Sequence, residues 1–127
     1  MRDRVVWCDK GWMPLSYGFC PSERAWKREL KRLEADETYP YPTTDAGTTF
    51  VEGPHKGVIV TLNERFDKER DRVGVVCLLV HEATHVWQAI REDIGEHKPS
   101  HEFEAYAMQN ISMNLIQAYN DTRRKIL

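Results

Sequence analysis

The sequence predicts an α+β fold, with one small sheet and three helices in a single domain over residues 1–127. Two observations favour this class: apolar stripes with helical spacing follow Ser22, Asp71 and Ser100, and two short β-branched runs separate the first helix from the second. A chain of 127 residues can bury one core but is too short for two ordinary domains. Its 41% hydrophobic and 30% charged residues are typical of a soluble globular protein.

The chain begins with residues rich in Trp, Gly and Pro that show no clear period. We therefore expect an irregular N-terminal arm over residues 1–20. Ser22 is a good N-cap for the first helix, in which Trp26, Leu30 and Leu33 fall on one stripe.

A loop and a hairpin are expected next. Residues 39–48 hold two prolines and a glycine, which are typical of a loop. The runs TTFVE and VIVTLN flank a Gly- and Pro-containing turn at residues 53–57, a pattern that predicts a β-hairpin. His55 lies in that turn and is expected to be exposed.

A long helix is expected from about Asp71 to Glu92. It carries two apolar stripes, which predicts a helix buried at the centre of the domain. One stripe is Val73, Val76, Val80, Thr84 and Trp87, and the other is Leu79, Ala83, Val86 and Ile90. Cys77 falls in the same apolar run, where we expect its thiol to pack as a small hydrophobic group.

The net charge, the hydropathy and the cysteine content indicate which partners and which cellular compartment to expect. The net charge of −2 gives no overall basic field, so we expect no nucleic acid partner. The apolar run over residues 73–80 is too short to span a bilayer, so we expect no membrane partner. The three cysteines form no CxxC pair, and the first residues do not resemble a signal peptide. We expect reduced thiols and a cytoplasmic protein.

The segment HEATH within the long helix matches the pattern H-E-x-x-H. Four residues advance a helix by about 400°, so His81 and His85 are offset by about 40° and one turn. Both imidazoles can therefore reach one tetrahedral zinc ion. Glu82 lies about 100° around from His81, where a general base can reach a water on the metal. The alternative is a pair of histidines that form hydrogen bonds inside an ordinary core. We favour the metal, because a single ion would be the partner of both imidazoles, which we expect to be buried.

Zinc needs a third protein ligand beside an open position. Ser100 can cap a last helix whose first turn offers His101, Glu102 and Glu104. Helical phase favours Glu104, since its stripe is apolar and should face the core. That stripe continues as Met108, Ile111 and Leu115. Glu102 and His101 begin more mixed faces and are the alternative third ligands.

HEATH, followed nineteen residues after His85 by Glu104 and then Ala105, resembles the gluzincin metallopeptidases, and HEATH is close to the HELTH of the thermolysin group. More narrowly, LLVHEATHVWQ and IGEHKPSHEFEAYAMQNI look like segments of small zincin-like metallopeptidases encoded by phages and prophages. The resemblance covers about residues 58–119. It implies a zincin-like fold, with the HExxH helix under a short sheet and a ligand on the next helix, and a bacterial or phage-infected cytoplasm.

The resemblance also implies an activity. One Zn²⁺ ion would be bound by His81, His85 and Glu104, and Glu82 would be the general base that activates a zinc-bound water. The substrate would be a peptide or protein, cleaved with narrow specificity. The VIVTLN run is the expected edge strand beside the cleft, where a peptide could pair by β-augmentation.

Departures from the family pattern keep other hypotheses open. Met108 stands where thermolysin-type enzymes place an aspartate, which favours as an alternative a zinc-binding module without proteolytic turnover. A third hypothesis, a zincin acting on DNA-bound proteins, depends on Arg2, Arg4 and the basic tail at residues 123–125. The candidates for stabilising an oxyanion are Arg91, His97, His101 and Tyr119.

Overall fold

The computed structural model describes residues 2–68 and 71–127, and within them a four-stranded mixed sheet has the strand order β1-β2-β4-β3. The strands are β1 (Val6–Trp7), β2 (Ser16–Cys20), β3 (Ala46–Val51) and β4 (Gly57–Leu62). β2 and β4 pair in parallel at the centre, while β1 and β3 are antiparallel to their neighbours. Together with the helices, this mixed sheet confirms the α+β class.

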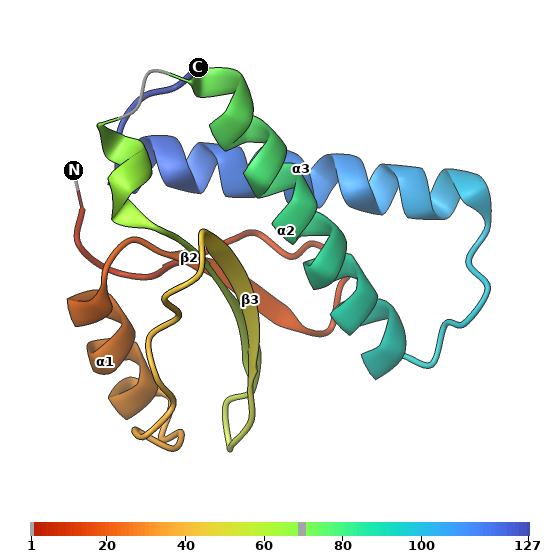
Figure 1. Ribbon diagram of the computed structural model, residues 1–127. Helices are drawn as coiled ribbons and strands as arrows, with labels where there is room; N and C mark the ends of the chain where they lie inside the picture. The colour runs from red at the N-terminus through yellow and green to blue at the C-terminus, as the bar shows by residue number, and fades with distance from the viewer. Residues whose placement is uncertain (1, 69–70) are drawn as a thin grey trace.

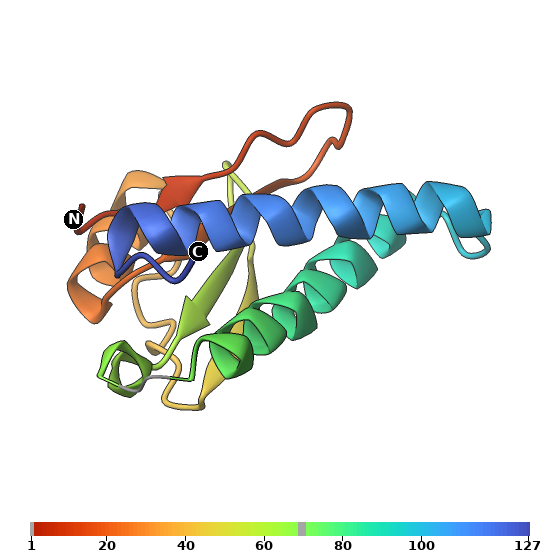
Figure 2. The same cartoon turned by 90° about the horizontal axis from the view of Figure 1, so that it is seen from above.

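The helices cover the two faces of the sheet, with α1 (Glu23–Arg32) on one face and α2 (Arg72–Asp93) and α3 (His101–Thr122) on the other (Figure 1). Figure 1 and Figure 2 show that α2 runs obliquely across α3, and the two helices pack against each other. A short 3-10 helix, η1 (Glu64–Asp67), follows β4. The layers explain the two buried clusters, one between the sheet and α1 and the other between the sheet and the two long helices.

The predicted helix boundaries are confirmed by their caps. The Ser22 hydroxyl accepts a hydrogen bond from the Ala25 amide over 3.1 Å, and the Ser100 hydroxyl accepts one from the Phe103 amide over 3.2 Å. Asp71 caps α2 in the same way. The predicted stripe of α1 is buried against the sheet. Local sequence signals therefore located all of these helix starts.

The irregular arm expected over residues 1–20 is wrong in its second half, because β2 lies at the centre of the sheet. Tyr17 and Phe19 point to the side of the two long helices, while Cys20 joins the cluster under α1. β2 pairs with β4, whose matching residues lie about forty positions later in the chain. Such a parallel pairing is nonlocal, so no nearby turn signal reveals it.

The hairpin of β3 and β4 is confirmed, but the predicted edge strand is wrong. β4, which holds the VIVTLN run, is fully buried between β2 and β3. The edge strand next to β4 is β3, and β1 forms the opposite edge of the sheet. The reason is visible in burial: every residue of β4 is buried, whereas β3 is largely half-buried.

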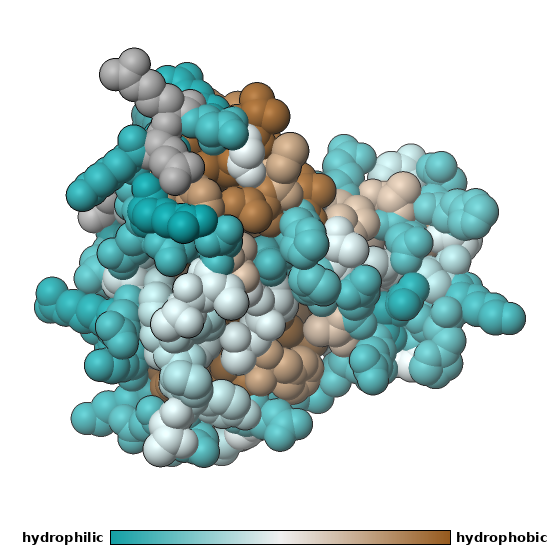
Figure 3. Space-filling model, viewed as in Figure 1, coloured by the Kyte–Doolittle hydropathy of each residue, from teal (hydrophilic) through white to brown (hydrophobic). Residues whose placement is uncertain are grey.

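α2 is buried along one face rather than all round. Leu79, Ala83 and Ile90 are fully buried, whereas Val73 is 73% exposed and Val80 is 38% exposed. Hydrophobic surface accordingly gathers near the beginning of α2 (Figure 3). Cys77 is exposed as well, so the expected packing of its thiol is wrong. By length and composition α2 is apolar enough to cross a membrane, a property that core helices share.

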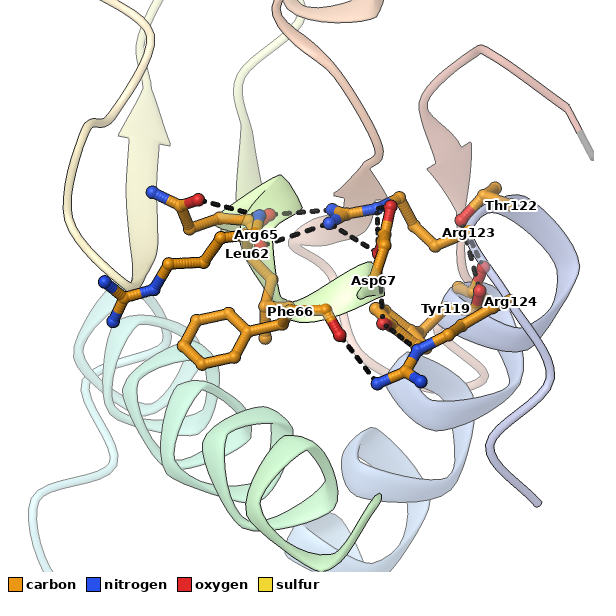
Figure 4. A network of polar contacts seen from close by, with 10 residues as sticks. Leu62, Arg65, Phe66, Asp67, Tyr119, Thr122, Arg123 and Arg124 are labelled. Atoms are coloured by element: carbon orange, nitrogen blue, oxygen red, sulfur yellow. Dashed lines mark hydrogen bonds and ion pairs between the residues drawn. The ribbon is translucent and has the colours of Figure 1, made fainter. Parts of the chain in front are cut away.

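The C-terminal end of α3 is fastened to η1 by a polar network (Figure 4). The buried Arg123 guanidinium donates to Asp67 Oδ1 over 2.8 Å and to the Leu62 carbonyl over 2.7 Å. Arg124 donates to the Phe66 carbonyl over 2.6 Å. Two of the three basic residues at positions 123–125 therefore hold the fold together. Their guanidinium groups are engaged within the protein and are not free to bind a partner.

Candidate metal centre

His81, Glu82 and His85 lie together in the middle of α2. Each offers one ligand atom, and these atoms all lie within 4.8 Å of one another. They face a pocket of about 440 Å³ between α2 and the edge strand β3. The other residues lining the pocket are Ala46, Gly47, Thr48, Phe50, Val58 and Ala89. The helical offset inferred from the motif is thus realised, and the group opens onto a space that can admit a ligand.

The two histidines are exposed, which corrects the expectation that they are buried. Their rings lie 5.0 Å apart and are tilted by 73°. Glu82, in contrast, is only 4% exposed. Both imidazoles are therefore accessible to an ion from solvent, and the alternative of two histidines satisfied inside a core is wrong.

Gln88 fixes the orientation of the second histidine. The Nδ1 atom of His85 lies 3.0 Å from Gln88 Oε1. An amide oxygen only accepts hydrogen bonds, so this contact favours the neutral tautomer with the proton on Nδ1, in which Nε2 keeps a lone pair for a metal. Metal-binding histidines commonly have such a partner on the other ring nitrogen. Gln88 comes one turn after His85, so its proximity follows from helical spacing, but the motif itself does not point to it.

Thr48 on β3 holds the buried carboxylate of Glu82. Its hydroxyl donates to Glu82 Oε2 over 3.0 Å and lies 3.4 Å from the Glu82 carbonyl oxygen. A buried carboxylate without a partner would be costly, and this hydrogen bond removes much of that cost. Sequence reasoning missed Thr48, because it lies 34 residues away in a strand and carries no motif.

Glu104 lies apart from this group in the structure. Its Oε2 accepts a hydrogen bond from Trp87 Nε1 over 2.8 Å and lies 3.4 Å from Arg91 Nη1. Trp87 follows His85 by two residues, which places it about 200° around the helix. Within residues 2–68 and 71–127, the cluster of close ligand atoms contains neither Glu104 nor the alternatives Glu102 and His101.

The candidates for stabilising an oxyanion also have defined places. Arg91 contacts Glu104, and the hydroxyl of Tyr119 donates to Asp67 over 3.2 Å, outside the pocket. His97 and His101 are exposed. These four side chains are not among the residues that line the pocket beside His81, Glu82 and His85.

Comparisons with family models, with curated proteins and with solved structures give no match. The fold and the site by themselves define an α+β protein with a candidate metal-binding His-Glu-His group on its central helix. Two exposed imidazoles and a carboxylate beside them are ligand types that zinc binds in proteins.

Proposed function

We propose that this protein is a zinc-dependent peptidase in which Glu82 is the general base. The observation that carries the proposal is the placement of one buried carboxylate beside two accessible imidazoles, on a pocket at the edge of a sheet. The motif's resemblance to gluzincin metallopeptidases supports the same activity.

His81 and His85 would hold the metal through their imidazole nitrogens. The Gln88 contact supports this role, because it leaves Nε2 of His85 free to bind. Glu104 is the proposed third ligand. Its carboxylate contacts Trp87 and Arg91, on another side of α2 from His85, so α3 would have to shift against α2 to bring it to the histidines. Bound zinc would supply a Lewis acid that polarises a carbonyl and makes water more acidic.

Glu82 would take a proton from the attacking water and return it to the leaving amine. This role requires a carboxylate that reaches the pocket in a fixed orientation. Thr48 supports it by occupying Oε2, which leaves Oε1 available for the water. Burial of Glu82 limits competing contacts with bulk solvent.

β3 would bind the substrate as an added strand. Within the described chain, β3 pairs with β4 on one side only, so its other edge offers unpaired backbone groups. Ala46, Gly47 and Thr48 of this strand line the pocket that holds the histidines. A peptide along this edge would therefore pass beside Glu82.

The second candidate is a zinc-binding module without turnover. It is favoured by the contact of Glu104 with Trp87, because this contact holds the expected third ligand away from His81, Glu82 and His85. Against it stands the exposure of both histidines, because structural zinc sites are normally closed.

Cleavage of a peptide library by zinc-loaded protein tests the proposal. Glu82→Gln should retain zinc but lose cleavage by at least about 100-fold, because the amide cannot accept the proton. Glu92→Gln is the matched control, since Glu92 is an exposed glutamate on the same helix. Equal cleavage by wild type and Glu82→Gln would contradict the assignment. Zinc binding with no chelator-sensitive cleavage would favour the module.

A further inference from the structure

A second set of pockets lies along α1, on the face of the sheet opposite α2 and α3. Two pockets of about 460 and 330 Å³ share Trp7 and Arg32 in their linings, so they adjoin one another. We call the pair the basic groove, after the residues Arg2, Arg4, Arg28, Arg32 and Lys56 that line it. The basic groove is separate from the metal centre, so its role is independent of the proposed peptidase activity.

The fold creates the charge of the basic groove from three distant segments. Arg2 and Arg4 precede β1, Arg28 and Arg32 lie one turn apart on α1, and Lys56 lies in the turn between β3 and β4. The whole chain has a net charge of −2, so this concentration leaves the remaining surface more acidic. Net charge alone therefore hides a local basic field of the kind that attracts polyanions.

Some of these cations pair with carboxylates and others do not. Glu29, the acidic residue in the lining, is buried and forms an ion pair with Arg32. Arg2 lies 3.7 Å from Asp121, and Lys56 lies 3.0 Å from Asp93. The remaining two arginines of the groove, at positions 4 and 28, are exposed and form no ion pair with any residue that the structure describes. Arg28 donates a hydrogen bond to the Asp3 carbonyl over 3.2 Å, so no carboxylate among the described residues neutralises either guanidinium.

Trp7 lies in the wall that the two pockets share, and its ring is held against the sheet. A Cβ atom at Gly57 would lie 2.9 Å from Cη2 of the indole, and one at Gly18 would lie 3.1 Å from Cδ2. Glycine at both positions lets the six-membered ring pack against β2 and β4. Nε1 also donates to Glu29 Oε2 over 3.2 Å. The indole is therefore a fixed aromatic surface that is half-buried and still lines both pockets.

We propose that the basic groove binds single-stranded nucleic acid. Guanidinium groups bind phosphates well, and an aromatic ring among them offers a stacking surface for an unpaired base. An acidic peptide would use the charge but has no base to stack on Trp7, and a duplex keeps its bases stacked internally. The expectation of no nucleic acid partner rests on net charge, which averages over the surface; this proposal replaces it.

Binding is tested by fluorescence anisotropy with a labelled oligothymidylate of about 20 nucleotides, long enough for several contacts. The full metal-free chain is titrated at about 50 mM and about 200 mM salt. With about three phosphate contacts, affinity should fall roughly 20-fold between these conditions. Micromolar binding with this salt dependence supports the proposal, and no binding at the lower salt overturns it.

Variants place the binding in the groove. Arg4→Glu with Arg28→Glu should weaken binding by at least about tenfold. The control Lys98→Glu with Lys125→Glu makes the same change in net charge at exposed sites outside the groove, and it should bind far more tightly than the groove variant. An equal loss in both double variants would show nonspecific attraction and overturn the assignment.

Trp7→Phe and Trp7→Leu test stacking. Trp7→Leu should bind the oligothymidylate on the order of tenfold more weakly, while Trp7→Phe should retain most of the affinity. Thermal unfolding of each variant shows that it is folded. Equal binding by the Leu variant would contradict the base-stacking role, as would tighter binding of a duplex. Competition by polyglutamate as effective as by unlabelled oligothymidylate would identify an acidic protein as the partner instead.

Discussion

The hydroxyl of Thr48 on the edge strand β3 donates a hydrogen bond to Glu82 Oε2 on α2 over 3.0 Å. This contact joins the strand proposed to bind substrate to the proposed general base. Thr48→Val removes the hydroxyl at nearly constant shape, so we expect kcat of peptide cleavage to fall on the order of tenfold. Zinc content should not change, because Thr48 is not among the clustered ligands.

Thr48→Ser separates positioning from packing. The serine hydroxyl can restore the hydrogen bond, so this variant should recover most of the lost kcat. If kcat fell equally in Thr48→Val and Thr48→Ser, the hydrogen bond of Thr48 would not be what matters, and its positioning role would be wrong.

Gln88→Ala should weaken zinc binding by about 10- to 100-fold, because His85 loses the acceptor that fixes its tautomer. Competition with a chromophoric chelator measures the affinity. Gln109→Ala on the exposed face of α3 is the control and should bind zinc as the wild type does. Unchanged affinity in Gln88→Ala would show that the contact has no role in metal binding.

Glu104 is tested by its contact with Trp87. If Glu104 becomes the third ligand, zinc should change the tryptophan fluorescence, because Trp87 Nε1 loses its acceptor. Trp87→Phe should lack that change. Glu104→Gln can still accept from Trp87 but should bind zinc at least about tenfold more weakly. Unchanged zinc affinity in Glu104→Gln would point to Glu102 or His101.

The three cysteines should differ in reactivity. Burial raises the pKa of the Cys8 thiol to about 12 and that of the Cys20 thiol to about 12, so both stay protonated at pH 8. Cys77 is exposed. A disulfide exchange reagent should therefore react rapidly with one thiol in the native protein and with three after denaturation. Rapid reaction of all three in the native state would contradict the packing around β2.

Local patterns in the sequence predicted the helices and the grouping of His81, Glu82 and His85 at the candidate metal centre. Caps at Ser22 and Ser100 act within a few residues, and the offset of His81 from His85 is a property of any helix. These features need no knowledge of the rest of the fold, which is why they were correct.

Long-range relationships were not predictable in the same way. The parallel pairing of β2 with β4, the edge position of β3 and the reach of Thr48 to Glu82 all join segments far apart in the chain. Helical phase gave the direction of Glu104 from α3 but not the angle at which α3 crosses α2. The indole of Trp87, a donor on the facing helix, is therefore a partner that the sequence did not indicate.

We propose that His81 and His85 hold one zinc ion. The most direct measurement is the zinc content of wild type and of the double variant His81→Ala with His85→Ala, each loaded with zinc, dialysed and analysed by atomic emission. Both should fold, since the two histidines are exposed. We predict about one zinc per wild-type chain and almost none in the variant. Equal zinc in both proteins, or none in the wild type, would contradict zinc binding by these two histidines.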